Sequence, residues 1–187
     1  MIPPRPTELA HRLVRDALRE GDLAIDATAG NGHDTLMLAA RVGESGRVLA
    51  IDVQPGAIES ARLRIEGAGF TNRVEFHLTS HARMAELAAP AAASVIMFNL
   101  GYLPGGDHAL TTDAAGTLRA LEAARVCLKP GGLLTVVCYP GHSAGAIEAG
   151  AVEEWLEARG GDGWRVAKYA MLGTREPSPF LLTACRR

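Results

Sequence analysis

Residues 23–35 read LAIDATAGNGHDT, and this stretch decides the fold of the chain. Residues 23–25 predict a short apolar strand that ends at Asp26, residues 29–32 predict a glycine turn, and a helical pattern begins near Asp34. A strand, a glycine turn and a helix in this order open the cofactor site of open α/β folds. Glycine lets the backbone adopt left-handed conformations and lets a ligand approach closely, and free amides at the helix start face that ligand.

The same region favours one class of cofactor. A second apolar run, residues 48–51, ends at Asp52, where an acidic residue after the second strand would meet the ribose hydroxyls of a nucleoside. The dinucleotide fingerprint requires a third glycine three residues after the second, and here that residue is Thr35. Asp34 complements the helix dipole but competes with a pyrophosphate for the helix amides. These features favour a nucleoside cofactor without phosphates, and S-adenosylmethionine fits that description.

Length and composition predict one soluble globular domain over residues 1–187. The chain has 187 residues, of which 48% are hydrophobic and 21% charged. Its net charge of −2 provides no global basic field for nucleic acid. Two of the 19 basic residues are lysine, so the other 17 are arginine, which suits phosphate groups. Any RNA-binding surface is therefore expected to be a local patch.

Cysteine usage and hydropathy predict a cytoplasmic protein without a membrane partner. Cys127, Cys138 and Cys185 are odd in number and widely spaced, which is typical of buried, reduced thiols. The first residues lack the apolar core of a signal peptide, and no apolar run approaches the length of a membrane span. No metal site is predicted.

Apolar runs and helical spacings alternate along the chain. Strands are expected at residues 23–26, 48–52, 74–78, 94–98 and 133–138, and helices at 6–18, 34–42, 55–67, 82–88, 111–128 and 144–159. Residues 164–171 and 180–185 predict two further strands, which should pair antiparallel because no helix separates them. This is the order of a class I (Rossmann-like) methyltransferase: α/β, with a doubly wound, mostly parallel, seven-stranded sheet and an antiparallel C-terminal hairpin strand.

Polar residues follow several strands at the expected carboxyl edge of the sheet. Thr79-Ser80-His81 follows one strand, NLGYLPGGDH (residues 99–108) follows the next, and YPGH (residues 139–142) follows the fifth. Ser80 either contacts an adenine or caps the next helix. The polar face of the first helix carries His11, Arg12, Arg15 and Arg19, and it is either solvated or in contact with substrate.

Three of these motifs support a resemblance to a known family. DATAGNGHDT, NLGYLPGGDH and YPGH resemble bacterial S-adenosylmethionine-dependent methyltransferases once labelled rRNA methylases. That family is now assigned to the tRNA wobble uridine, where it converts 5-aminomethyl-2-thiouridine to the 5-methylaminomethyl form. The resemblance extends from about residue 7 to the C-terminus. The family's last loop carries an Asn-x-x-Asn-x-Pro-Pro pattern, whereas GTREPSPF here keeps Pro179 and Phe180 without the asparagines.

The resemblance implies a set of cofactor contacts. Asp26, Gly30, Asn31, Gly32 and Asp34 would line the methionine end of S-adenosylmethionine, and Asp52 would hold the ribose. Gln54 and Ser80 would lie near the adenine, with His81 and Asn99 at the same site.

The resemblance also implies a place for the substrate. The residues expected there are Leu100, Gly101, Tyr102, Asp107, His108, Tyr139 and His142. Asn99 would orient the reactive amine through its carbonyl oxygen, and Tyr102 would either stack on the base or pack beneath the loop. His81, Asp107, His108 and His142 are alternatives for taking the released proton or for binding the nucleotide.

The expected partner is the anticodon loop of tRNA, and a homodimer is left open. Methylation of rRNA or of a small-molecule amine is the first alternative activity. A nicotinamide-dependent oxidoreductase is a second alternative, disfavoured by Thr35 and Asp34, and a catalytically silent RNA-binding module is a third.

Overall fold

A computed structural model describes residues 2–101, 113–174 and 177–186. The strands of this part of the chain are β1 (Leu23–Asp26), β2 (Arg47–Asp52), β3 (Val74–Leu78), β4 (Ala93–Asn99), β5 (Leu128–Cys138), β6 (Trp164–Ala170) and β7 (Phe180–Arg186). Its α-helices are α1 (Pro6–Ala17), α2 (His33–Val42), α3 (Pro55–Gly67), α4 (Ala114–Cys127) and α5 (Ser143–Gly160). Two 3₁₀ segments, η1 (Thr71–Arg73) and η2 (His81–Glu86), flank β3.

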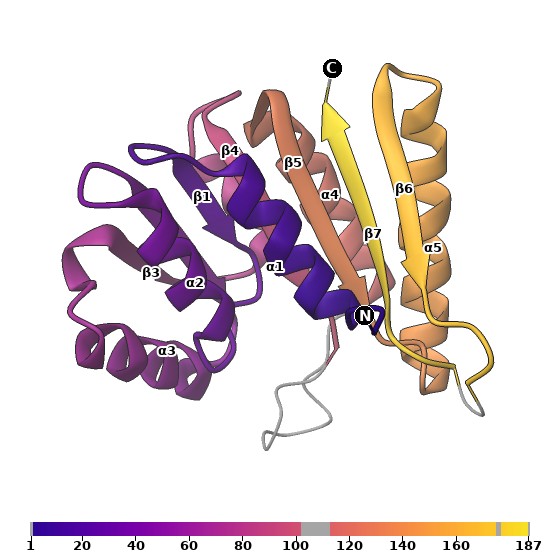
Figure 1. The fold of residues 1–187 in the computed structure, drawn as a ribbon, viewed down its shortest axis with the longest axis horizontal. Helices are drawn as coiled ribbons and strands as arrows, with labels where there is room; N and C mark the ends of the chain where they lie inside the picture. The colour runs from indigo at the N-terminus through magenta and orange to yellow at the C-terminus, as the bar shows by residue number, and fades with distance from the viewer. Residues whose placement is uncertain (1, 102–112, 175–176, 187) are drawn as a thin grey trace.

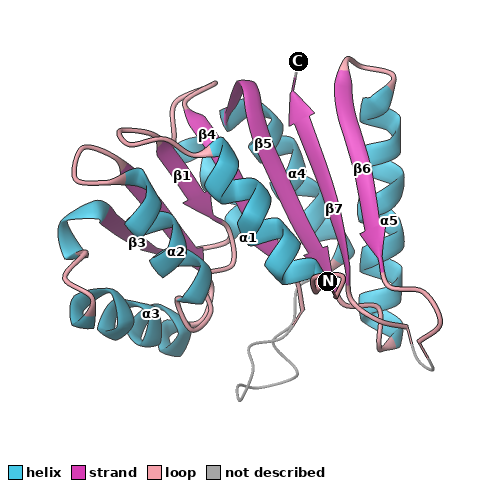
Figure 2. Ribbon diagram, viewed as in Figure 1, coloured by secondary structure: helices cyan, strands magenta, loops and turns pink. Residues whose placement is uncertain are grey.

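The strands form one seven-stranded sheet in the order β3-β2-β1-β4-β5-β7-β6 (Figure 2). Strands β1 to β5 are mutually parallel, and β7 runs antiparallel to both β5 and β6. The predicted class I methyltransferase architecture is therefore confirmed. Because the chain leaves β1 toward β2 on one side and reaches β4 on the other, the order reverses beside β1. Open α/β sheets bind ligands at the carboxyl ends of the strands at such a point.

Helices cover both faces of the sheet, with α1, α2 and α3 on one side and α4 and α5 on the other (Figure 1). Neighbouring residues of one strand therefore pack in different hydrophobic clusters, one on each face of the sheet. In β1, Ala24 packs with α1 and α2, whereas Ile25 packs in the cluster that includes residues of α4 and α5. This arrangement explains why the central strands are almost continuously apolar.

Two predicted elements differ from the structure. The helix expected over residues 82–88 is the 3₁₀ segment η2 over His81–Glu86, in which Arg83 N donates to Ser80 O over 2.9 Å; the tighter 3₁₀ turn is common in short segments of this kind. Strand β5 begins at Leu128 rather than at residue 133. Leu128 pairs with Ala93 and Leu133 with Val95, so a bulge accommodates Gly131 and Gly132, which lie between the helix and the strand expected from the sequence.

Cysteine burial follows the prediction at two of three positions. Cys127 and Cys138 are buried, but Cys185 is only partly buried because it lies near the end of β7. Within the described part of the chain, no helix combines the length and apolar character needed to cross a bilayer.

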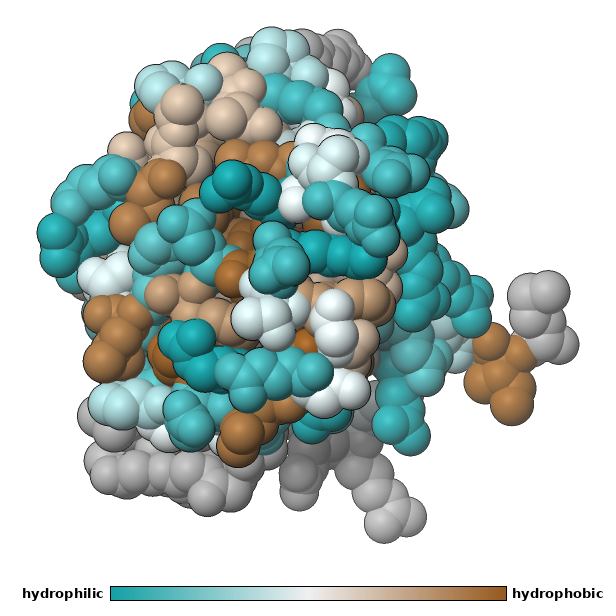
Figure 3. Space-filling model, turned by 90° about the vertical axis from the view of Figure 1, so that its left-hand side faces the viewer, coloured by the Kyte–Doolittle hydropathy of each residue, from teal (hydrophilic) through white to brown (hydrophobic). Residues whose placement is uncertain are grey.

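The β3 edge of the sheet carries a mixed surface. Figure 3 views the molecule from this side and shows apolar residues scattered among hydrophilic ones. The Arg62 guanidinium lies 4.9 Å from the Phe76 ring centre, and that of Arg73 lies 4.3 Å from the ring centre of Phe70. These charged groups cover aromatic rings at the edge strand β3. Charged groups at a sheet edge disfavour pairing with a strand of another chain.

Candidate active site

A cavity of about 970 Å³ opens at the carboxyl ends of β1 to β5. Most of its wall comes from the five loops that follow these strands, and the rest comes from the starts of α2, η2, α4 and α5 and from the segment before β7. Its volume lies near the top of the range of about 300–1,000 Å³ that is usual for ligand pockets. Its position at the reversal of strand order matches the site that the sequence predicted.

The glycine turn closes one side of this cavity. Gly30 and Gly32 have φ values of 50° and 76°, so both adopt the left-handed conformation that the sequence indicated. The Gly30 amide donates to Asp52 Oδ2 over 2.9 Å, and the Gln54 amide donates to Asp52 Oδ1 over 2.9 Å. Each carboxylate oxygen keeps further acceptor capacity toward a ligand.

Asp26 and Gly32 lie behind the cavity wall and are not among its lining residues. Asp26 is fully buried, and its two oxygens accept from Thr35 Oγ1 over 2.6 Å and from Thr28 N over 3.2 Å. Burial and the nearby Asp34 charge raise the pKa of Asp26 to about 7. A Cβ atom on Gly32 would lie 2.7 Å from Ala61 Cα, so this glycine lets α2 approach α3. Both residues therefore support the glycine turn without lining the cavity.

Asn99 ends β4 and is one of the residues that line the cavity. Its backbone amide donates to Thr28 Oγ1 over 2.8 Å, and its Nδ2 atom lies 3.5 Å from Asp34 Oδ2. Its Oδ1 atom is buried and has no hydrogen-bond partner among the described residues. A buried carbonyl oxygen without a partner costs free energy unless a ligand supplies the donor.

Tyr139 stands beside Asn99 at the end of β5. Burial and the Asp34 charge raise the pKa of Tyr139, while a hydrogen bond with the Asn99 side chain lowers it. Tyr139 and Asn99 both line the cavity.

His81 lines the same cavity as a neutral imidazole. Its Nδ1 atom donates to the Ala27 carbonyl over 3.3 Å, and its ring lies 5.7 Å from that of Phe98. Burial lowers the pKa of His81, more strongly than its hydrogen bond and the nearby Asp52 charge raise it. Because Nδ1 carries the proton, Nε2 is the lone-pair acceptor of the ring.

Most other predicted site residues also line the cavity. These are Gly30, Asn31, Asp34, Asp52, Gln54, Ser80, Leu100, Gly101, Tyr139 and His142. Ser80 and His142 have local roles as well, since Ser80 Oγ accepts from Ala82 N and His142 Nδ1 accepts from Gly145 N at the start of α5. The predicted residues Tyr102, Asp107 and His108 lie outside the described residues.

Sequence reasoning missed several residues of the site. Asp113 and Arg119, from the start of α4, line the cavity together with Pro177, from the segment before β7. Asp113 could have been found as a helix cap, because its side chain accepts from Gly116 N over 2.9 Å. Arg119 had no local signal, since an arginine on an exposed helix face is common.

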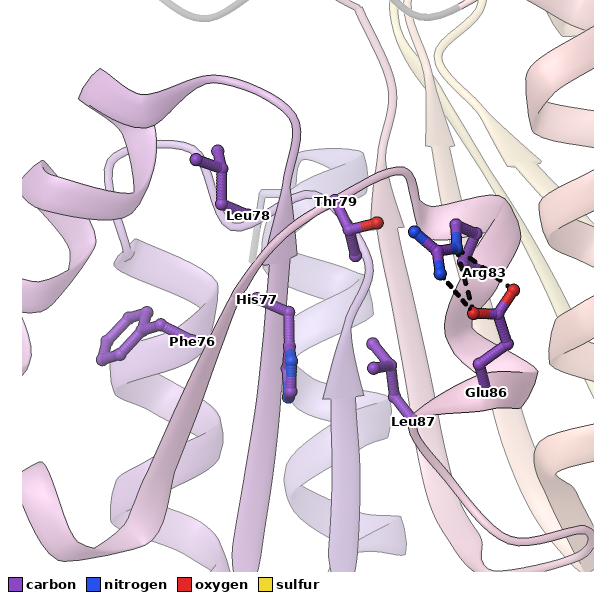
Figure 4. Close-up of a pocket in the computed structure, with 7 residues that line it drawn as sticks. All are labelled: Phe76, His77, Leu78, Thr79, Arg83, Glu86 and Leu87. Atoms are coloured by element: carbon purple, nitrogen blue, oxygen red, sulfur yellow. Dashed lines mark hydrogen bonds and ion pairs between the residues drawn. The ribbon is translucent and has the colours of Figure 1, made fainter.

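A second hollow of about 250 Å³ lies between the end of β3 and η2 (Figure 4). Arg83 and Glu86 on its rim are paired with each other at 2.6 Å and are exposed to solvent. An ion pair that is already satisfied offers a ligand little charge to bind. The larger cavity, with its unpartnered Asn99 oxygen, is therefore the candidate active site.

The residues of the cavity fit a positively charged nucleoside. Among the residues that the structure describes, Asp34, Asp52 and Asp113 contribute three carboxylates to its wall, and Arg119 contributes one guanidinium. Such a wall favours a sulfonium cation and disfavours a pyrophosphate. The exposed side chain of Val53 supplies an apolar surface next to Asp52 for a nucleobase.

Comparison with known proteins agrees with this geometry. A family model described as "Putative rRNA methylase" matches residues 48–185. The chain is 38% identical over 193 residues to the Arabidopsis thaliana protein named tRNA (mnm(5)s(2)U34)-methyltransferase, chloroplastic, a match that covers 98% of this chain and 70% of that protein.

Two solved structures extend the comparison to the fold. An rRNA methylase structure from Clostridium thermocellum is 32% identical, with a TM-score of 0.96 over the whole of both chains. A methyltransferase structure from Streptococcus mutans in complex with SAH is 29% identical, with a TM-score of 0.89, again over the whole of both chains.

Proposed function

Because the chain belongs to this rRNA methylase family, we propose that it methylates the exocyclic amine of 5-aminomethyl-2-thiouridine at the wobble position of tRNA. The chain is an S-adenosylmethionine-dependent methyltransferase, and the product would be the 5-methylaminomethyl nucleoside. The 38% identity to a tRNA (mnm(5)s(2)U34)-methyltransferase over almost the whole chain supports this substrate.

The cofactor would lie across the ends of β1 and β2. Asp52 would accept hydrogen bonds from the ribose hydroxyls with the lone pairs that Gly30 and Gln54 leave open. Ser80 and Val53 would flank the adenine, and Asn31 and Asp34 would face the methionine end. S-adenosylmethionine supplies a methyl group on a positively charged sulfur, so that a nitrogen–carbon bond forms while the carbon–sulfur electron pair stays on sulfur.

The unpartnered Asn99 Oδ1 atom is the observation that supports an amine as the acceptor. An amine offers the N–H donor that this buried oxygen lacks. Accepting that hydrogen bond would direct the nitrogen lone pair at the methyl group. Such alignment is worth an effective molarity on the order of 10⁵ M or more for well-oriented groups.

The reaction releases one proton, because an alkyl ammonium has a pKa of about 10 and must lose a proton before it can attack. Attack by the neutral amine gives the secondary ammonium directly, which stays protonated at neutral pH, so the one proton released is the proton lost before the attack. The neutral His81 imidazole has its Nε2 lone pair available for that first proton. We therefore assign His81 as the proton acceptor among the residues suggested by the sequence.

The anticodon loop suits this cavity, because a wobble base is single-stranded and reaches a pocket without melting of a duplex. A cavity of about 970 Å³ leaves space for such a base beside a nucleoside cofactor. Arg119 would contact a phosphate at the rim, and Tyr102, which lies outside the described residues, would stack on the base.

The test is methyl transfer from labelled S-adenosylmethionine to two matched tRNAs, one bearing 5-aminomethyl-2-thiouridine and one bearing unmodified uridine at the wobble position. We expect label only on the first tRNA, with a mass increase of one methyl group on that nucleoside. Label on ribosomal RNA or on a small amine, and none on the modified tRNA, would replace the substrate while leaving the methyltransferase in place.

A further inference from the structure

His11 of α1 contacts the active site from behind. Its Nε2 atom lies 2.6 Å from Asp34 Oδ1, and the two side chains are 27% and 12% exposed. Asp34 lines the cavity, but His11 does not. The contact therefore joins a cavity residue to a helix outside the wall.

The donors and acceptors around Asp34 follow from its charge. Asp34 stands in the first turn of α2, where the helix dipole favours an ionised carboxylate, and its charge contributes to the raised pKa of the buried Asp26 beside it. An ionised carboxylate only accepts hydrogen bonds. His11 must then present Nε2–H to Oδ1, and Asn99 must present Nδ2 to Oδ2 across the 3.5 Å that separates them.

The Asn99 amide thereby has one permitted orientation. Turning it over would place Oδ1 against the Asp34 carboxylate and the amide nitrogen where an N–H donor is expected. The buried Oδ1 atom is thus held as the open acceptor.

We propose that His11 is a positioning residue for methyl transfer: it holds Asp34 so that Asp34 keeps Asn99 Oδ1 directed at the acceptor amine. This inference rests on the proposed amine substrate. Without the His11 hydrogen bond, the Asp34 carboxylate stays at the cavity wall but is no longer held in one orientation, and the Asn99 amide is then no longer fixed. The consequence falls mainly on the rate of transfer, because His11 does not line the cavity and Asp34 keeps its charge near the methionine end.

The test uses three variants that differ in where they place a donor. In His11→Gln the side-chain amide nitrogen stands close to the position of Nε2, in His11→Asn the shorter side chain cannot reach Asp34, and His11→Ala has no donor. Asp16→Ala, at an exposed position of the same helix, is the matched control. Single-turnover rates on the aminomethyl tRNA, the KM for that tRNA, the Kd for S-adenosylmethionine and the melting temperature are measured for each.

We expect His11→Ala and His11→Asn to lower the rate by about ten-fold or more, the effect of losing a hydrogen bond to a charged group, with KM and Kd within about three-fold of wild type. His11→Gln should recover most of the rate. Equal rates for wild type and His11→Ala would overturn the proposal. So would equal losses in all three variants accompanied by weaker cofactor binding or a lower melting temperature, since these indicate a structural role.

Failure of the proposed substrate is distinguishable from failure of this inference. An inactive wild-type protein on the aminomethyl tRNA refutes the substrate, and the His11 proposal is then judged by the NMR signals of the Asn99 side-chain NH₂ group, assigned with Asn99→Asp. Those signals should move in His11→Ala and His11→Asn and stay near their wild-type positions in His11→Gln. Unchanged signals in all three variants would refute the positioning role.

Discussion

The Gly30 amide donates a hydrogen bond to Asp52 Oδ2 over 2.9 Å, which joins the loop after β1 to the loop after β2. The same carboxylate accepts from Gln54 N through its other oxygen. Asp52 therefore shapes the glycine turn and also presents its remaining lone pairs to the cavity. Under the proposed function, the same side chain would also hold the ribose of the cofactor.

Replacement of Asp52 should weaken cofactor binding more than it weakens the fold. Asp52→Asn retains one acceptor oxygen but loses the charge and the second acceptor, so we expect the Kd for S-adenosylmethionine to rise by about ten-fold or more. Isothermal titration calorimetry measures this change. Glu59→Gln removes a charge from an exposed position of α3 and serves as the control, which should bind like wild type. Equal affinities for both variants would contradict the ribose assignment.

Asn99→Ala should separate binding from turnover. The variant lacks the buried acceptor oxygen but keeps the backbone hydrogen bond to Thr28 Oγ1. We expect S-adenosylmethionine binding within about three-fold of wild type and a fall in kcat on the order of 10²-fold, the cost of losing one preorganised polar contact to the reacting group. Calorimetry and single-turnover labelling measure the two quantities. A variant that transfers methyl groups at the wild-type rate would exclude Asn99 from amine orientation.

Gly32→Ala and Gly69→Ala form a matched pair for stability. Both glycines have a φ of 76°, but a Cβ atom at Gly69 meets open space whereas one at Gly32 lies 2.7 Å from Ala61 Cα. Gly69→Ala should cost about 1–2 kcal/mol, the penalty of the left-handed conformation alone. Gly32→Ala should cost about 1–3 kcal/mol more, because α2 and α3 must separate. Urea unfolding of both variants measures this difference. An equal loss in the free energy of unfolding would show that α2 and α3 move apart at no additional cost.

Asp26 should make the stability depend on pH. Its pKa in the folded protein is raised to about 7 from an ordinary value of 3.8, mainly by burial. Between these two values the folded state holds a proton that the unfolded state has lost, so the free energy of unfolding falls as pH rises from about 4 to about 7. In Asp26→Asn, Thr35 Oγ1 can accept from the new amide while Thr28 N keeps its acceptor.

The stability of Asp26→Asn relative to wild type should therefore increase between pH 5 and pH 8, by at least about 1.4 kcal/mol, the equivalent of one pKa unit. Urea unfolding at both pH values measures the change. Asp16→Asn, at an exposed position of α1, is the control and should show no such trend. A constant difference between Asp26→Asn and wild type across this range would mean that Asp26 is ionised in the folded protein throughout.

The sequence alone determined the class of fold and the site of the cavity. Apolar runs, helical spacing and glycine turns are local properties, and they predicted the seven strands, the C-terminal antiparallel pair and the polar strand ends that line one edge. The pattern was less informative at 129–132, because a bulge inside β5 and a turn before it both use glycine.

The roles of individual residues were decided by tertiary structure. Asp26 and Gly32 are close in sequence to residues that line the cavity. The Asp26 side chain is nevertheless buried in the core, and a Cβ atom on Gly32 would point at α3. Arg119 and Pro177 reach the cavity from distant segments. His11 meets Asp34 across 23 positions, and Asp34 meets Asn99 across 65. A local pattern specifies which element forms and which face it buries, but the side chains that meet depend on how the helices pack against the sheet, and that is a property of the whole fold.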